Sequence, residues 1–452
     1  MTSRVGSGHT RRRFLARSGA ALAALTLPTP LWGSEGSGPR PIPEYDGTLD
    51  DVLFVYDLCA APHLLRQVVE ILRLAPVDAR VHALVSRGRS DEARAALATH
   101  GFDAIRWIVT DEDDVSGFWG RDILQVGRAR DGKRIAHVPW FKSATQREDL
   151  ERTVRALAGL EGHGIGVQLL PVAAEGGNMI AGDDVLFAGS TIAFETRAIT
   201  QHFWGFDPGD DGVARILQEA FGVDSVQWIG PRPRGTCRPQ SRYVFHVDML
   251  MTLLGPHEAI VARCDPARLD TVEHRAILDE EAARTLESLE RREAMGIAWP
   301  DGLELPRDAS ARGAFLDERL RIERELLASA ASEMDAAARQ LESTSWRVDR
   351  IDADPRRVRR FQSATNVVCA RDRLLVPLYP HRELVHGWVV RRDGGRDAVG
   401  VDLGLRDSDF SLTGDNLDRV EFFRTRHAHV RAVRDYFYLA SGNVHCVVGR
   451  LS

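Results

Sequence analysis

Val52-Leu53-Phe54-Val55-Tyr56 is a short apolar run of strand type that opens a regular alternation of sequence periods. Residues 62–74 follow with apolar side chains at helical spacing, and 81–85 form a second run of strand type. Ser90 is placed to cap a second helix, and 105–109 form a third strand-type run. The order strand, helix, strand, helix, strand predicts an α/β fold.

The same alternation continues through most of the chain. Strands are predicted at 134–141, 167–172, 185–188, 225–229, 346–351 and 374–377, and helices at 147–160, 213–221 and 428–434. A tight hairpin is predicted at Asp183-Asp184. Residues 243–250 alternate as a strand does, which would place His246 and Asp248 on one face of it.

Residues from about 265 to 344 have a different composition, rich in Ala, Glu, Arg and Leu. Helices are predicted at 269–295 and 314–342, separated by the break Trp299-Pro300-Asp301-Gly302. This region is interpreted as a helical insertion. A lid and a solvated amphipathic insertion without a catalytic role remain the two alternatives, and the second is the more common use of helices with many charges.

Composition excludes a nucleic-acid-binding protein. The 452 residues carry a formal net charge of −6, with 44% hydrophobic and 27% charged residues. A basic patch or stripe is the electrostatic signature of nucleic-acid binding, and this chain has neither. The acidic balance is compatible with a cationic small substrate.

Residues 1–46 are predicted to be a twin-arginine-type signal and leader. Thr10-Arg11-Arg12-Arg13-Phe14-Leu15 precedes a short apolar run at 20–27. That run is shorter than the roughly 20 residues that a transmembrane helix needs, so no membrane contact is expected of the mature form. An ordinary secretion signal is the alternative. Either signal predicts an exported protein, periplasmic or extracellular.

Cys446 stands near the end of the chain, after a Gly-Asn turn and before a β-branched pair. It is one of five widely spaced cysteines that form no CxxC pair. A lone cysteine is commonly a small buried hydrophobe, and becomes a candidate nucleophile only when partners are found elsewhere in the chain.

Such partners recur at the ends of strand-like units. The motifs are Trp119-Gly120-Arg121-Asp122, Glu175-Gly176-Gly177-Asn178, His246-Val247-Asp248 and Gly442-Asn443-Val444-His445-Cys446. In this order they resemble the guanidine-modifying family of agmatine deiminases and Porphyromonas-type peptidylarginine deiminases. The resemblance implies the pentein fold, a five-bladed α/β propeller, as a catalytic domain over 47–452 with the helical insertion inside it.

The chemistry of these residue types agrees with that resemblance. A guanidinium is planar and cationic, so two carboxylates, Asp122 and Asp248, can hold it by charge-assisted hydrogen bonds. Its carbon is a poor electrophile, which calls for a thiolate nucleophile, assigned to Cys446. His246 can protonate the leaving ammonia and then deprotonate water. By resemblance, Glu175, Asn366 and Trp119 belong to the substrate-binding part of the site.

The predicted enzyme is a cysteine-dependent hydrolase acting on a small guanidino substrate or an arginine-containing peptide, without metal or cofactor. Export favours arginine or peptidyl-arginine over a polyamine precursor. Alternatives are an agmatine deiminase, an amidinotransferase and an exported guanidino-binding protein without turnover. A zinc site using His246, Asp248, His445 and Cys446 is a further alternative, although no short paired ligand spacing supports it.

Overall fold

The structure is a computed structural model. It describes residues 39–46, 51–60, 62–75, 78–102, 104–112, 115, 120–142, 144, 146–230, 246–269, 272–280, 283, 308–358, 362–370, 373–380, 389–390, 396–397, 407–435 and 449–451. Among these residues, no helix has the length and apolar character needed to cross a bilayer.

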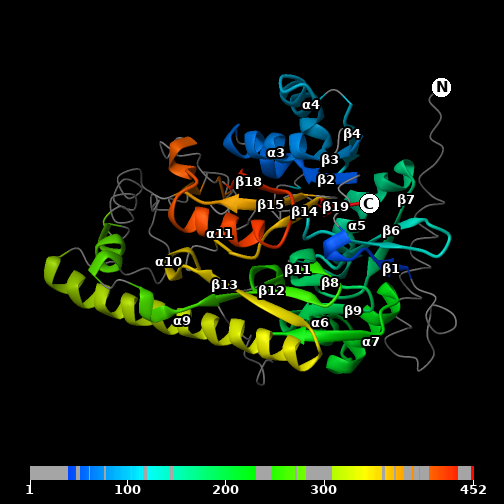
Figure 1. Ribbon diagram of the computed structural model, residues 1–452. Helices are drawn as coiled ribbons and strands as arrows, with labels where there is room; N and C mark the ends of the chain where they lie inside the picture. The colour runs from blue at the N-terminus through cyan, green and yellow to red at the C-terminus, as the bar shows by residue number, and fades with distance from the viewer. Residues whose placement is uncertain are drawn as a thin grey trace, which may run out of the picture.

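The predicted α/β alternation near the N-terminus is confirmed. Strands β2 (Asp51–Val55), β3 (Arg80–Ser86) and β4 (Arg106–Thr110) pair in parallel, with α3 (Pro62–Leu74) and α4 (Ser90–Ala98) between them (Figure 1). Every residue of β2 is buried, as expected of a parallel strand covered on both faces. Ser90 is the first residue of α4 and does not cap it, because the N-cap position is Arg89.

One pattern of strand pairing recurs in five sheets. In each, a first strand lies antiparallel to a second, and the second lies parallel to a third. The triplets are β5 (Gln125–Arg128), β6 (Arg134–Pro139) and β7 (Ile165–Leu170); β8 (Met179–Ala181), β9 (Val185–Gly189) and β10 (Ser225–Ile229); β11 (Met251–Gly255), β12 (Glu258–Cys264) and β13 (Arg347–Ala353); β14 (Val368–Ala370), β15 (Arg373–Leu378) and β18 (Val430–Arg434); and β19 (Gly449–Arg450), β2 and β3. β1 (Arg40–Pro41) extends the first triplet, and β16 (Val389–Val390) pairs with β17 (Arg396–Asp397).

Helices join the two parallel strands of each sheet, because a parallel connection must cross from one end of the sheet to the other. Besides α3, they are α5 (Arg152–Leu157), α6 (Ser190–Trp204), α7 (Gly209–Phe221), α9 (Ala309–Ser343) and α11 (Gly414–Arg424). The short helices α2 (Tyr56–Cys59) and α10 (Pro355–Val358) lie in loops. The predicted hairpin at Asp183-Asp184 is confirmed, since the amide of Gly182 donates to the Val185 carbonyl between β8 and β9.

Two predictions of secondary structure are wrong, and one helix has no prediction. The predicted strand at 243–250 is not continuous: His246 is extended, but Val247–Met249 form a 3-10 turn before β11. The predicted helix at 428–434 is strand β18, because its backbone pairs in parallel with the edge of β15. α6 was not predicted at all. It contains four threonine and serine residues within 190–204, which weaken the helical signal.

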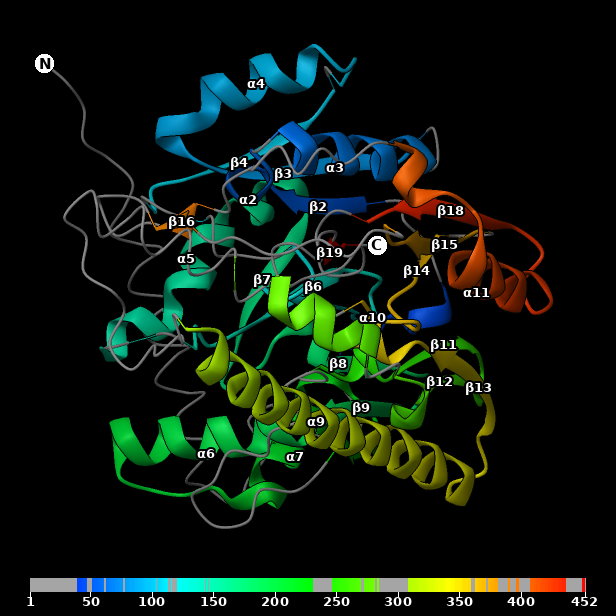
Figure 2. The ribbon, with the colours of Figure 1, turned by 90° about the vertical axis from the view of Figure 1, so that its left-hand side faces the viewer.

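The region expected to be a helical insertion includes a helix that the fold itself uses. α9 connects β12 to β13 and lies along the outside of the molecule beside them (Figure 1, Figure 2). Its second half packs into the main core through Leu327, Ala330, Met334, Ala338 and Leu341. Its first half is joined to the helix at 272–280 by the ion pairs His274–Glu323 and Arg275–Asp317.

The described end of the chain is part of the core. β19 pairs with β2, and the amide of Leu451 donates to the Asp51 carbonyl at 2.9 Å. The Leu451 side chain is fully buried, in a cluster that includes Leu53 and Val126. Arg134 donates to the Leu451 carbonyl at 3.1 Å. The last strand therefore closes the first sheet of the chain.

Candidate active site

Four of the predicted site segments occupy the same position in four different sheets. Asp122 stands three residues before β5, Asp248 three residues before β11, Asn366 two residues before β14, and Glu175 four residues before β8. Each therefore lies at the entrance to the first, antiparallel strand of its sheet. The positions are far apart in sequence but structurally equivalent.

The side chains of these segments converge on Gly177. A Cβ atom at this residue would lie 2.8 Å from Asp248 Oδ2, 3.0 Å from His246 Nδ1 and 3.1 Å from Asp122 Oδ1. The amide of Gly177 donates to Asp122 Oδ1 at 3.0 Å. Gly176 is equally restricted, because a Cβ atom there would overlap the Arg121 carbonyl oxygen. The two glycines let the backbone pass close to the polar groups.

Glu175 and His246 form a close pair. Glu175 Oε2 lies 2.5 Å from His246 Nε2. Both residues are extended, with φ and ψ of −124° and 142° for Glu175 and −125° and 152° for His246, and each precedes a three-residue 3-10 turn. This shared conformation turns the two side chains toward each other from neighbouring sheets.

Charge and burial set the protonation of this pair. Burial disfavours the imidazolium of His246, but the carboxylates of Glu175, Asp122 and Asp248 outweigh it and raise the pKa of His246 to about 9. Burial also disfavours the carboxylate of Glu175. His246 and then Lys142 outweigh that effect and hold the pKa of Glu175 well below its ordinary value.

Asp122 is shifted in the opposite direction. Burial raises the pKa of Asp122 to about 6, and the like charges of Glu175 and Asp248 add to the rise, while His246 opposes it. Two carboxylates of one site thus have pKa values moved apart by their surroundings, a feature common at functional sites. At neutral pH a cation arriving beside Asp122 would favour its ionised form.

Asp248 is held by the loop at 362–366. Asn366 Nδ2 donates to Asp248 Oδ2 at 3.0 Å, and Thr365 Oγ1 donates to the Asp248 carbonyl at 3.1 Å. Ser363 Oγ donates to the carbonyl of Met249 at 3.1 Å. All of these polar groups are buried, so the orientation of the carboxylate is set by its partners.

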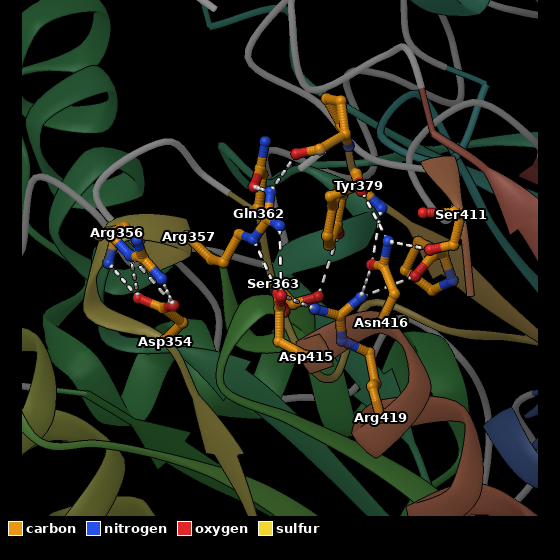
Figure 3. Close-up of polar contacts among 12 residues, drawn as sticks. Asp354, Arg356, Arg357, Gln362, Ser363, Tyr379, Ser411, Asp415, Asn416 and Arg419 are labelled. Carbon is orange, nitrogen blue, oxygen red and sulfur yellow. Dashed lines mark hydrogen bonds and ion pairs between the residues drawn. The ribbon is translucent and has the colours of Figure 1, made fainter. Parts of the chain in front are cut away.

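A second layer of polar contacts supports that loop (Figure 3). Tyr379 donates its hydroxyl to the Ser363 carbonyl at 3.0 Å, and Arg357 Nη1 donates to Gln362 Oε1 at 2.9 Å. Asn416 binds both main-chain groups of Tyr379, accepting from its amide at 3.1 Å and donating to its carbonyl at 2.7 Å. The loop that carries Asn366 is therefore fixed at both ends.

Lys142 is a member of this site that the sequence did not reveal. Its Nζ lies 2.8 Å from Glu175 Oε2 and 2.8 Å from Glu195 Oε2. It follows β6, in the loop after Trp140-Phe141, and no motif marks it. In the sequence it is distinguished only by its position three residues beyond a strand end, which many surface lysines share.

Of the predicted site residues, Asp122, Glu175, His246, Asp248 and Asn366 are brought together. Trp119 and Cys446 lie outside the described residues. Two of the described cysteines are poor nucleophiles, because burial raises the pKa of Cys59 and raises that of Cys264 to about 12. Within the described part of the chain, no group of three or more His, Cys, Asp and Glu side chains is arranged to hold a metal ion.

No family model matches the chain, and no curated protein matches it by sequence. Solved structures match it over most of its length. One provisionally described as a peptidyl-arginine deiminase is 13% identical, with a TM-score of 0.52, and the match covers 92% of this chain and 99% of the other.

Two further matches are agmatine deiminases. A cysteine-to-serine variant of the C. jejuni enzyme with substrate bound is 13% identical, with a TM-score of 0.51 and coverage of 91% of this chain and 96% of the other. The Enterococcus faecalis enzyme is 12% identical, with a TM-score of 0.50 and coverage of 92% and 97%. The chain therefore has the α/β pentein fold of the agmatine deiminase structures that it matches.

Proposed function

We propose that this protein is a guanidine deiminase, a cysteine-dependent hydrolase that converts the guanidine of an arginine-like substrate into a ureido group and releases ammonia. The observation that carries the proposal is the convergence of Asp122, Asp248 and the Glu175–His246 pair on Gly177. Three acids, of which Asp248 is buried and Asp122 and Glu175 are partly buried, surround one protonated histidine and form a site suited to a planar cation and to proton transfer.

Asp122 and Asp248 are proposed to bind the guanidinium. Carboxylates pair with guanidinium groups by bidentate, charge-assisted hydrogen bonds that fix the plane of the group. The hydrogen bond from Asn366 occupies one oxygen of Asp248, which aims the carboxylate. The substrate's charge offsets the crowding of acids that raises the pKa of Asp122.

In the first half-reaction, the Cys446 thiolate attacks the guanidinium carbon and forms a C–S bond. The C–N bond to one terminal nitrogen then breaks, and that nitrogen takes a proton from His246 and leaves as ammonia. The amidino group stays on sulfur as a cation. A His246 pKa of about 9 keeps the imidazole protonated for this step.

In the second half-reaction, neutral His246 accepts a proton from water as the water oxygen bonds to the amidino carbon. The C–S bond breaks, the thiolate is restored, and the ureido product leaves after the remaining proton on its oxygen passes to solvent, where ammonia takes it up. The net reaction consumes one water and yields one ammonium ion for each guanidinium. His246 returns to its protonated form.

The position of Cys446 in the chain supports its assignment. It precedes Gly449, the first described residue of β19, and β19 is the first strand of its sheet. Asp122 stands three residues before β5, and Asp248 three residues before β11, which are the first strands of theirs. Cys446 thus precedes the first strand of its sheet in chain order, as Asp122 and Asp248 do, and this shared order supports the proposal that it acts with these acids.

The test is an assay of ammonia and ureido product with arginine, arginyl peptides, methylated arginines and agmatine. Agmatine belongs in the set because two of the matching structures carry that activity in their names. Cys446→Ser should abolish product, while Cys369→Ser, at a half-buried cysteine of β14, should keep it. Full turnover by Cys446→Ser would overturn the mechanism.

The other outcomes of this assay separate the alternatives. Product from agmatine alone would make the protein an agmatine deiminase. A new guanidine without ammonia would identify an amidinotransferase, because the amidino group would then pass to an amine instead of water. Calorimetric binding of a guanidine without any product would indicate a binding protein. We also propose export by the twin-arginine route, to be tested by cell fractionation of an Arg11→Lys and Arg12→Lys double variant.

A further inference from the structure

Behind the Glu175–His246 pair lies a row of charges of alternating sign. Glu195, on α6, pairs with Lys142, which pairs with Glu175 at 2.8 Å in each case. His246 and Lys142 bind the same oxygen of Glu175, Oε2, at 2.5 and 2.8 Å. The side chains of Lys142, Glu195 and Glu175 are 22%, 14% and 35% exposed, so water screens this row only in part.

We propose that Lys142 and Glu195 are positioning residues that set the balance between the acid and base forms of His246, acting through Glu175. The inference rests on the proposed function, because it concerns the proton transfers of that reaction. Neither residue is expected to touch the substrate.

The physical reason is competition for one carboxylate. If His246 were the sole cation at Glu175, the carboxylate would hold the imidazole in its protonated form, and the base step would be slow at neutral pH. Lys142 places a second positive charge on the same oxygen and so makes the imidazolium easier to deprotonate. Glu195 moderates Lys142 in turn, since it draws part of that charge away from Glu175.

The charged groups that face His246 directly are Glu175, Asp122 and Asp248. All three are acids, and they raise the pKa of His246. Among the charges linked to Glu175 in the described residues, Lys142 is the cation besides His246 itself. Removing Lys142 or Glu195 should therefore move the protonation of His246 in opposite directions.

Two substitutions test this. Lys142→Met removes a positive charge and should raise the titration midpoint of His246, while Glu195→Gln removes a negative charge and should lower it. A charge within about 6 Å of a titrating group moves its midpoint by about one pH unit or more, which sets the size expected for Lys142→Met. Glu195 lies one ion pair further from His246, so the shift in Glu195→Gln should be smaller. A purely structural role would not give shifts of opposite sign.

The measurement is an NMR titration of protein labelled with ¹³C in the histidine rings, with the His246 signal assigned from its absence in His246→Asn. Lys142→Arg keeps the charge and should titrate near the wild type. Lys133→Met is the matched control, because Lys133 is also paired with an acid, Asp131, but precedes β6 while Lys142 follows it. This control should leave the His246 midpoint unchanged.

Turnover supplies a second readout. Lys142→Met should shift the pH optimum to higher pH and release a burst of one ammonia per enzyme at neutral pH, because the amidino-thioether accumulates when the base step slows. Glu195→Gln should shift the optimum to lower pH. Equal midpoints in all variants, or shifts of the same sign, would overturn the proposal.

The titration needs no substrate, so the two proposals fail separately. Opposite shifts without ammonia release from any guanidine would support the charge row and reject the deiminase. Turnover in the wild type with unchanged midpoints in the variants would support the deiminase and reject the charge row. Circular dichroism shows whether each variant folds. If Lys142→Met does not fold, the midpoints of Glu195→Gln and Lys142→Arg still test the proposal.

Discussion

Gly177→Ala tests whether the polar groups around this residue work as one site. The added methyl group would lie 2.8 Å from Asp248 Oδ2, 3.0 Å from His246 Nδ1 and 3.1 Å from Asp122 Oδ1, where ordinary contacts begin near 3.4 Å. Each group must retreat by a few tenths of an ångström. The backbone itself accepts alanine, because Gly177 does not have a positive φ.

Gly177→Ala should lower the catalytic activity strongly and the free energy of unfolding only slightly. The three atoms are at the ends of side chains that can move, so the free energy of unfolding should fall by only about 1 kcal/mol, the lower part of the range for overpacking. Catalysis depends on their mutual positions, and a displacement approaching 1 Å costs about 100-fold in rate. Because each group moves by only part of that distance, we expect kcat/KM to fall by about 10-fold.

The assay is ammonia release at several substrate concentrations, together with urea unfolding of the same samples. Gly88→Ala is the matched control, since a Cβ atom at residue 88 meets nothing within 4 Å and should leave both quantities unchanged. Activity of Gly177→Ala within threefold of the wild type would refute the placement of these three groups around the substrate. Loss of folding would instead show that the contacts are rigid.

Three further predictions concern stability. His137 is fully buried without a hydrogen-bond partner for either ring nitrogen, and burial lowers its pKa to about 3. Its neutral form therefore stabilises the fold above pH 6.5, and this stability is lost as pH falls toward 3. In urea unfolding, His137→Leu should reduce the loss of stability between pH 8 and pH 5 by about 2 kcal/mol, and an unchanged loss would contradict this explanation. Burial raises the pKa of Glu333 to about 7, so this group favours the fold at low pH and opposes it as pH rises through 7. Glu333→Gln should therefore raise the free energy of unfolding by about 2 kcal/mol at pH 8 and change it little at pH 4, and equal effects at both pH values would count against a buried carboxyl group. Removing residues 449–452 keeps Cys446 but deletes β19 and the contact between Arg134 and the Leu451 carbonyl. We expect this variant to unfold at a lower temperature and to lose ammonia release. Full activity would show that β19 is dispensable.

Local sequence predicted an element correctly where its pattern of apolar residues fits only one type of secondary structure. The apolar runs of β2 and β3 and the helical spacing of α3 predicted their structures because a buried strand and an amphipathic helix leave different periods in the chain. Local sequence gave the wrong prediction where tertiary contacts determine the secondary structure. β18 carries exposed and buried positions without clear alternation, and becomes a strand because β15 offers it an edge.

Only part of the candidate site could be predicted, because some of its residues are marked by motifs and others only by contacts in space. Asp122, Glu175, His246 and Asp248 stand in the ordered motifs, and the resemblance that these motifs carry added Asn366. Lys142 stands in no motif, and its role depends on distances to Glu175 and Glu195 that no spacing in the chain encodes. The strand expected to put His246 and Asp248 on one face is a 3-10 turn, yet both side chains reach Gly177.

The sequence by itself determined the α/β class, the polar residue types at the strand entrances, and the chemistry that those types permit, because these depend on local periodicity and on functional groups. Only the tertiary structure decided that α9 is the connection between β12 and β13, that the last strand closes the first sheet, and that Lys142 shares Glu175 with His246. These three features are contacts between segments far apart in the chain, and such contacts depend on packing geometry, which a linear pattern does not carry.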